Sequence, residues 1–280
     1  MKIRETNVAT LVSSSENDSI LKEETQKMKK KLVIIDNPVG STIQPSPGFM
    51  KKHLADYHLE LAALCEFGCI YCSTDSGPGT VFKSRTYKNA ARAQYPEDLK
   101  GRDPKLQKFC KTYAISYNDV VSKLESDLEA LDPVKTIGKT LMFGQLVDNF
   151  GPELMKQGIT RRALELVLEK TSFHIRCLSK STAVANDSLM ELYGTHPDRF
   201  VVGLSIGTMD DSFGGIIEKG TSRPTARIGA LHKLQHAGIK TYGMLCPVFK
   251  PSLEGRKLET LIELIRPVQC EHIWVEPYND

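Results

Sequence analysis

The 280-residue chain has an ordinary composition for a soluble protein, with 40% hydrophobic residues, 25% charged residues and a formal net charge of +3. This weakly basic balance does not by itself indicate a nucleic-acid partner, and the length suits one large domain or two small ones. The polar start resembles no signal peptide, and no stretch approaches the roughly 18 apolar residues of a membrane span. Seven cysteines, three of them within eight residues, are unlike the disulfide framework of a small secreted protein. We therefore expect a cytoplasmic protein with no membrane segment.

The first part of the chain is expected to lack a core of its own. Residues 1–31 are polar with little periodicity, and residues 37–48 are rich in Pro, Gly and Ser, so residues 1–48 are interpreted as a flexible leader and loop. Residues 49–280 are expected to form one core domain that carries a basic insertion at 73–115.

From His58 onward, short apolar runs alternate with stretches of helical spacing, which predicts βαβ units and a parallel sheet. The predicted strands are 58–64, 140–143, 173–178, 199–206, 239–245 and 269–275. The predicted helices are 118–131, 160–170, 187–193, 224–236 and 258–265. Six strands are fewer than the eight of a complete barrel, so we predict an α/β fold with a partial (βα)6 TIM-like barrel. Because the sequence ends on a strand, this barrel is expected to lack its last helix.

Three cysteines follow the first predicted barrel strand in the segment Cys65-Glu-Phe-Gly-Cys69-Ile-Tyr-Cys72, a C-x3-C-x2-C pattern. Thiolates this close in sequence are able to converge on one metal centre, and sulfur ligands favour iron–sulfur clusters, zinc or copper(I). A structural zinc site normally takes its fourth ligand from a second pair of closely spaced cysteines or histidines, and the other cysteines of the sequence each stand alone. Three protein ligands leave one iron of a 4Fe–4S cluster open, which suits catalysis.

With its place after the first strand of an α/β barrel, this motif resembles that of the radical S-adenosylmethionine superfamily. Further motifs are similar in order and spacing to its spore photoproduct lyase-like branch, a group that includes DNA repair enzymes. They are Gly158-Ile-Thr-Arg-Arg162, Leu178-Ser-Lys-Ser181, Gly203-Leu-Ser-Ile-Gly-Thr208, Ala237-Gly-Ile239, Cys246-Pro-Val248 and Glu276-Pro-Tyr-Asn279. The resemblance covers roughly residues 57–280.

The resemblance implies a lyase-like enzyme with two cofactors. Cys65, Cys69 and Cys72 would hold a 4Fe–4S cluster whose open iron chelates S-adenosylmethionine. The reduced cluster would cleave this cofactor to methionine and a 5′-deoxyadenosyl radical, which then abstracts hydrogen from an unidentified substrate. An electron donor such as a flavodoxin or ferredoxin is implied as a partner.

Three further residues are assigned to the cofactor through the resemblance. Lys180 and Ser205 match a lysine and a serine that contact S-adenosylmethionine, and their chemistry suits its carboxylate and ribose. Asp148 follows the second strand, where the superfamily commonly has a Gly-Gly-Glu triplet that this chain lacks. Gln145, Asp148 or backbone carbonyls are candidates to accept the cofactor's ammonium group, and Asp148 is the better one because it is charged. Loop or turn roles remain the alternatives for all three.

The chain also departs from the lyase. Gln145 stands where the lyase has a cysteine hydrogen donor, and Ser73 replaces a tyrosine that follows the last cluster cysteine, whereas Tyr71 matches. Repair of the spore thymine dimer by the same radical relay is therefore not implied.

The segment 73–111 carries basic residues with interleaved tyrosine and phenylalanine, a combination able to bind a nucleic-acid backbone and stack bases. A solvated lid over the barrel mouth is the favoured alternative. For the whole chain, two other functions stay open. One is a radical enzyme that modifies a peptide or small molecule, and the other is a non-catalytic module that binds metal through the three cysteines.

Overall fold

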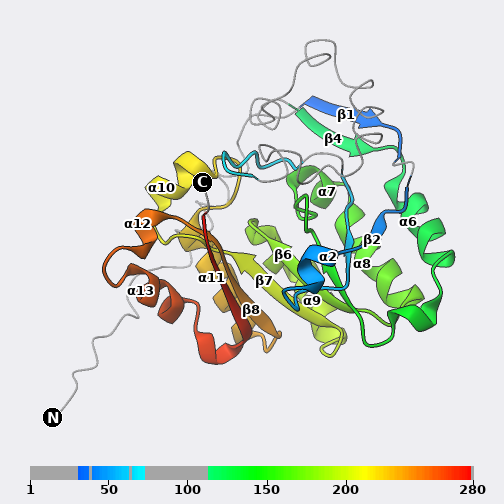
Figure 1. The fold of residues 1–280 in the computed structure, drawn as a ribbon. Helices are drawn as coiled ribbons and strands as arrows, with labels where there is room; N and C mark the ends of the chain where they lie inside the picture. The colour runs from blue at the N-terminus through cyan, green and yellow to red at the C-terminus, as the bar shows by residue number, and fades with distance from the viewer. Residues whose placement is uncertain (1–30, 38–39, 63–64, 73–112, 279–280) are drawn as a thin grey trace.

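The computed structural model of the protein describes residues 31–37, 40–62, 65–72 and 113–278 (Figure 1). Much of the expected leader and most of the basic insertion lie outside these residues. The remainder of the segment expected to be leader and loop includes two short strands and the start of a helical turn. Within the described residues, no helix is both long and apolar enough to cross a membrane.

The main sheet has seven strands in the order β2-β3-β5-β6-β7-β8-β9, of which all but the edge strand β2 run parallel. The strands are β2 Ile43–Pro45, β3 Tyr57–Leu59, β5 Thr140–Phe143, β6 His174–Ser179, β7 Phe200–Ser205, β8 Thr241–Val248 and β9 Cys270–Pro277. The six parallel strands correspond to the six that the sequence predicts, in the same order. The predicted partial barrel is thus confirmed.

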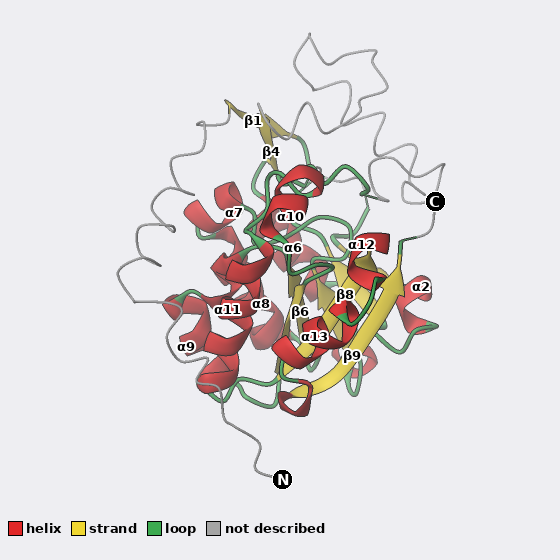
Figure 2. Cartoon of the chain, turned by 90° about the vertical axis from the view of Figure 1, so that its left-hand side faces the viewer, coloured by secondary structure: helices red, strands yellow, loops and turns green. Residues whose placement is uncertain are grey.

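Helices cover the outer face of this sheet (Figure 2). The α-helices are α2 Pro47–Met50, α6 Val120–Glu129, α7 Pro152–Lys156, α8 Ile159–Lys170, α9 Asp187–Thr195, α10 Asp211–Ile217, α11 Pro224–His236, α12 Lys250–Leu253 and α13 Lys257–Leu264. The short 3-10 helices are Pro133–Thr136, Thr182–Ala185 and Pro267–Gln269. The predicted helix 224–236 has the bounds of α11, which ends where Gly238 adopts the left-handed conformation with φ 72°.

A second, two-stranded parallel sheet lies apart from the barrel, above α6 in Figure 1. It pairs β1 Lys31–Ile35 with β4 Tyr113–Tyr117. Ile35 and Tyr117 are buried and join the main core, which attaches this small sheet to the barrel domain.

Two cores lie on opposite faces of the main sheet. The larger core is between the sheet and the helices and includes Ile175 and Cys177 of β6. The smaller core fills the inside of the barrel, the lumen, with Met142, Tyr242 and Met244 at its centre. Burial on both faces explains why the central strands β5, β7 and β8 appear in the sequence as nearly continuous apolar runs.

The lower lumen is closed by packing around Tyr242. Its ring is fully buried beside Gly203, and the Arg176 guanidinium lies 5.2 Å from the centre of this ring and 4.9 Å from that of Trp274. Arg176 also donates to the Leu54 carbonyl at 2.8 Å. The segment after α2 therefore seals the lumen opposite the carboxyl ends of the strands.

A methyl group at Gly203 should disturb this packing, since a Cβ atom there would lie 2.6 Å from the Tyr242 ring. We expect Gly203→Ala to lower the free energy of unfolding by about 1–3 kcal/mol. Gly194→Ala in α9 is the matched control, because a Cβ atom there meets no atom within 4 Å. Urea denaturation of both variants measures the difference, and equal stabilities would contradict this account of the lumen.

His58 gives the fold a dependence on pH. It is buried beside Met142 in register, its Nδ1 has no hydrogen-bond partner, and burial lowers its pKa to about 4. The neutral form is therefore the one that fits the fold, whereas the unfolded chain binds a proton below pH of about 6.5.

We expect no effect of His58 protonation on the free energy of unfolding above pH of about 6.5. As the pH drops from there towards 4, the free energy of unfolding should fall by up to about 3 kcal/mol. Replacement by a group that does not titrate, His58→Gln, should flatten the dependence of unfolding free energy on pH over this interval. His196→Gln, at an exposed position, serves as the control and should keep the wild-type slope. An unchanged slope in His58→Gln would show that other groups cause the dependence.

Candidate functional site

The three cysteines lie in a loop at the carboxyl end of β3, the cysteine loop, residues 65–72. Cys69 is buried, whereas Cys65 and Cys72 are partly exposed. Gly68 turns the loop with φ 61°, and the Cys72 amide donates to the Cys69 carbonyl at 3.2 Å. The loop is thus a tight turn with one thiol directed inward.

The cysteine loop is held on one side by α7. Glu66 is buried, and its Oε1 accepts a hydrogen bond from the Glu153 amide at 2.9 Å. Gly151 lies so close that a Cβ atom there would be 2.7 Å from the same oxygen. The first turn of α7 therefore fixes the start of the loop.

Lys180 and Ser205 come together at the carboxyl ends of β6 and β7. The Lys180 Nζ donates to the Ser205 Oγ at 2.8 Å, and this hydroxyl donates to the Cys246 carbonyl at 2.8 Å. The Lys180 Nζ also lies 5.7 Å from the centre of the Tyr71 ring, next to Cys72 in the cysteine loop. An ammonium and a hydroxyl are thus side by side near the thiols, and their contact with a cofactor stays a prediction.

Asp148 connects the loop after β5 to the end of β6. Its carboxylate accepts hydrogen bonds from the Ser179 hydroxyl at 2.9 Å, the Lys180 amide at 2.8 Å and the Phe150 amide at 3.0 Å. Burial raises the pKa of Asp148, and these hydrogen bonds oppose the rise. The carboxylate is therefore already occupied by the protein's own donors, and its predicted contact with an ammonium group stays a prediction.

Glu60, which the sequence analysis does not single out, shapes the loop after β5 from the other side. Its two carboxylate oxygens accept from the backbone amides of Gln145, Leu146 and Val147 at 2.9–3.2 Å. Burial raises the pKa of Glu60 to about 8, against the effect of these three hydrogen bonds. Because its amides point at Glu60, the backbone of this loop has a fixed conformation.

A buried ion pair between Glu218 and Arg227 lies beneath Lys180. From the sequence, an ion pair and a cofactor contact are equally open roles for these two residues. Arg227 of α11 is fully buried and donates to the Glu218 carboxylate and to the Ser205 carbonyl. The other Glu218 oxygen accepts from the Tyr71 hydroxyl and lies 4.0 Å from the Lys180 Nζ.

Electrostatics keep Glu218 ionised. Burial acts to raise its pKa, but the charges of Arg227 and Lys180 outweigh burial, and the pKa lies below its usual value. In the sequence, the charged residue Arg227 is spaced from Leu231 and Leu234 so that all three lie on the same, buried face of α11. Such a residue requires a buried partner.

Aromatic side chains surround the outer end of the cysteine loop. Phe249, which follows β8, stacks on Tyr278 with ring centres 5.0 Å apart and meets the rings of Tyr71 at 4.9 Å and Phe213 at 5.6 Å. Together they form an aromatic cluster at the carboxyl ends of β8 and β9, with one stacked pair and two edge-to-face contacts.

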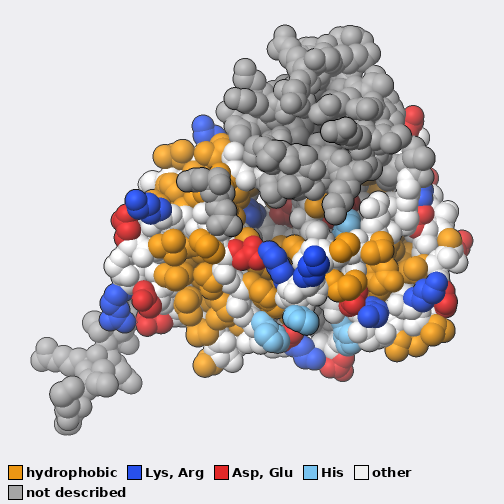
Figure 3. All heavy atoms as spheres, in the orientation of Figure 1, with side chains coloured by type: hydrophobic (Ala, Val, Ile, Leu, Met, Phe, Trp, Pro, Cys, Tyr) orange, Lys and Arg blue, Asp and Glu red, His pale blue; other side chains and the backbone are white. Residues whose placement is uncertain are grey.

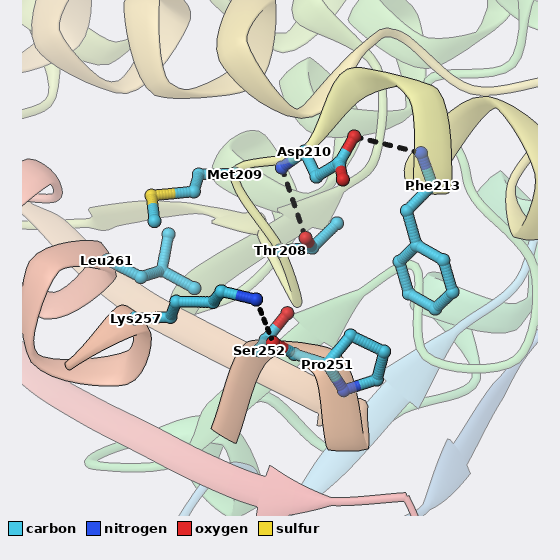
Figure 4. A pocket seen from close by; sticks show the side chains of 8 residues that line it. All are labelled: Thr208, Met209, Asp210, Phe213, Pro251, Ser252, Lys257 and Leu261. Atoms are coloured by element: carbon cyan, nitrogen blue, oxygen red, sulfur yellow. Dashed lines mark hydrogen bonds between the residues drawn. The ribbon is translucent and has the colours of Figure 1, made fainter. Parts of the chain in front are cut away.

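Phe213 also borders a cavity of about 280 Å³ between the end of β7 and the helices α12 and α13 (Figure 4). Its lining is Thr208, Met209, Asp210, Phe213, Pro251, Ser252, Lys257 and Leu261. The polar groups drawn there bond to one another: Lys257 donates to the Pro251 carbonyl at 3.1 Å, and Asp210 accepts from the Phe213 amide at 3.0 Å. The cavity is separated from the cysteine loop by the aromatic group.

The residues of the cysteine loop fit an iron–sulfur cluster in their chemistry. Three thiols are soft donors, and Lys180 supplies positive charge beside them. Burial raises the pKa of the Cys69 thiol to about 12, so metal binding there must displace a proton. In the described part of the chain, no three His, Cys, Asp or Glu side chains are close enough to bind a single metal ion. In a cluster, by contrast, each thiolate binds a different iron atom.

Figure 3 shows the face of the molecule on which α2 and β2 lie. Acidic and basic side chains adjoin near the middle of this face, between two areas of hydrophobic side chains. One ion pair between the segment after α2 and the sheet joins Lys52 to Glu276 of β9, and Glu276 also accepts from the Cys246 thiol at 3.4 Å. The Lys52–Glu276 ion pair thus links the segment after α2 to the last strand of the sheet.

Comparison with known proteins places this geometry among known folds. No family model matches the sequence. One curated protein, the uncharacterized protein ORF301 of Acidianus two-tailed virus, is 28% identical over 129 residues, which are 46% of this chain and 41% of that protein.

Several solved structures of spore photoproduct lyase resemble the chain. A variant with bound AdoMet (S-adenosylmethionine) and dinucleoside spore photoproduct matches with a TM-score of 0.55 and 16% identity, over 88% of this chain and 62% of that one. The lyase complexed with dinucleoside spore photoproduct matches with a TM-score of 0.55 and 18% identity, over 83% and 56%. A further variant gives a TM-score of 0.57 and 16% identity, over 86% and 60%.

The chain spans less than two thirds of the length of each of these proteins. The agreement extends over most of this chain, so it concerns the architecture as a whole. The chain therefore has the partial-barrel fold of spore photoproduct lyase, a radical S-adenosylmethionine enzyme, as its motifs predicted.

Proposed function

We propose that the protein is a radical S-adenosylmethionine enzyme whose cysteine loop holds a 4Fe–4S cluster. The observation that carries this proposal is the position of the three cysteines beside the Lys180–Ser205 pair at the carboxyl ends of the strands. Active sites of barrel enzymes are built at this end. When bound, the cluster and S-adenosylmethionine supply the one-electron chemistry that generates a 5′-deoxyadenosyl radical.

The protein's own residues bind and orient the cofactor in this proposal. Cys65, Cys69 and Cys72 are the cluster ligands. Lys180 attracts the methionyl carboxylate, and Ser205 holds the Lys180 amine in place by its hydrogen bond of 2.8 Å. The loop after β5, fixed by Glu60 and Asp148, offers oxygen acceptors for the ammonium group.

The aromatic group at the ends of β8 and β9 supports binding of the adenine ring. Tyr71, Phe249 and Tyr278 present flat faces and edges to one another at 4.9–6.4 Å between ring centres. Base–aromatic stacking contributes about 1–3 kcal/mol per base in nucleic-acid binding proteins.

For the substrate, we propose a nucleic acid as the first class to test. Two of the solved structures reported above contain a dinucleoside spore photoproduct. The basic segment 73–111, which lies outside the described residues, has the composition of a nucleic-acid contact. Gln145 stands where the lyase has its cysteine donor, so the fate of the substrate radical is expected to differ. A flavodoxin- or ferredoxin-like protein is proposed as electron donor.

Removal of the buried ligand should abolish the chemistry. We expect anaerobically reconstituted protein to hold about four iron and four sulfide per chain and to release 5′-deoxyadenosine from S-adenosylmethionine after dithionite reduction. Cys69→Ala should lose both, while Cys270→Ala, at the amino end of β9, should keep both. Stoichiometric zinc without sulfide in the wild type would instead establish a non-catalytic metal-binding module.

Lys180 should matter for cofactor binding and not for cluster content. Lys180→Ala is expected to raise the KM for S-adenosylmethionine about ten-fold or more, since a charged hydrogen bond contributes about 1.5–3 kcal/mol. Lys240→Ala, which removes an exposed ion pair with Asp198, is the control and should leave KM unchanged. If the two variants have equal KM values and normal iron content, Lys180 does not contact the cofactor.

A further inference from the structure

The last residue of α10 and the connection that follows it pack against the cysteine loop at three points. These residues, 217–222, are named the clamp segment below. Its first residue accepts a backbone hydrogen bond from the loop, since the Ile70 amide donates to the Ile217 carbonyl at 2.9 Å. The contact joins two parts of the chain that are about 150 residues apart, at the point between Cys69 and Cys72.

Gly220 brings the two backbones closer than any other residue type would permit. A Cβ atom at this position would lie 2.3 Å from the Phe67 carbonyl oxygen and 2.7 Å from the Phe67 Cα. These are backbone atoms, so a side-chain rotation would not relieve the overlap. Phe67 is itself buried, between Cys65 and Cys69.

Glu218 adds a side-chain link at the centre of the clamp segment. Its carboxylate accepts from Tyr71 in the cysteine loop and from Arg227 in α11, and it lies 4.0 Å from the Lys180 Nζ. The side chain thus touches both the loop that carries the thiols and the amine at the end of β6.

The clamp segment is also bonded to the chain around Lys180. The Ser222 amide donates to the Lys180 carbonyl at 3.1 Å, and the Ser222 hydroxyl accepts from the Thr182 amide at 3.0 Å. The Thr221 amide and hydroxyl both donate to the Glu218 carbonyl, at 3.0 Å and 2.9 Å, and make the segment a closed turn. A displacement of the segment would therefore move the cysteine loop and Lys180 relative to each other.

We propose that the clamp segment is a positioning element that sets the place of the cysteine loop relative to Lys180. Glu218 is its positioning side chain, and Gly220 provides the close backbone approach. What the element positions, a cluster and its cofactor, rests on the proposed function, but the mechanical role concerns this chain alone and is testable without metal.

The test uses the full-length, metal-free protein and the variant Gly220→Ala. Alkylation by iodoacetamide is followed at each cysteine by mass spectrometry. We expect Cys69, buried in the wild type, to react about ten-fold faster or more in Gly220→Ala, because the loop opens locally. Cys177 is buried in the main core and should react at its wild-type rate, as an internal measure of global unfolding.

Gly215→Ala in α10 is the matched control, because a Cβ atom there meets no atom within 4 Å. It should leave the rate at Cys69 unchanged. Unchanged reactivity of Cys69 in Gly220→Ala would overturn the proposal.

If Gly220→Ala unfolds and Cys177 also reacts faster, hydrogen exchange in the wild type decides the question. The Ile70 amide should then be protected and should exchange at the same rate as the amides of Thr221 and Ser222, because a single opening releases all three. Exchange of the Ile70 amide that is faster and independent of these two amides would reject the clamp.

Reconstitution separates this proposal from the function. If the wild type takes up a cluster, Gly220→Ala should weaken the change that S-adenosylmethionine causes in the electron paramagnetic resonance spectrum of the reduced cluster, whereas Gly215→Ala should not. If the wild type takes up no cluster, the proposed function fails, while the alkylation and exchange results still stand for the clamp.

Discussion

The arrangement of the site depends on one buried ion pair, Glu218 with Arg227. The Arg227 side chain is 0% exposed and that of Glu218 is 3% exposed, and burial of two charges costs several kcal/mol for each ion before their attraction is counted. Further contacts offset part of this cost. Tyr71 donates to Glu218, Lys180 adds a positive charge near it, and the Ser205 carbonyl accepts from Arg227. The Arg227 Nε is buried without a hydrogen-bond partner among the described residues. The ion pair is stable only when the cysteine loop, β6, β7 and α11 are all in place, so the site forms as one unit with the fold.

Much of the fold is predictable because burial on both sheet faces leaves continuous apolar strands and each long helix has one apolar face. The failures have local causes. Helix α10 was not predicted, since two of its seven residues are Gly214 and Gly215, which weaken any helical signal. Strand β2 has three residues, too few for a periodic pattern. The pairing of β1 with β4 joins segments about 80 residues apart, and no local pattern encodes such a contact.

In the candidate site, too, some residues could be identified from the sequence, whereas their contacts could not. The cysteines were identified because all three lie within eight residues, and Lys180 and Ser205 because their motifs resemble those of the spore photoproduct lyase-like branch. Sequence alone reveals a carboxylate at Asp148 but not that Ser179, Lys180 and Phe150 already donate to it. It also gives no sign that three consecutive amides turn towards Glu60. Such contacts arise from the meeting of two loops, which only the folded chain specifies.

The sealed lower lumen restricts how a large molecule reaches the thiols. Tyr242, Arg176 and the chain around Leu54 fill the barrel opposite the cysteine loop, so the described part of the barrel has no passage through its axis. The thiols are therefore approached from the carboxyl ends of the strands. For the proposed nucleic-acid substrate, this approach would require the reacting nucleotide to be turned out of its stack. Damaged or unpaired nucleotides leave the stack at the lowest energetic cost, so such a substrate would enter most readily at those positions.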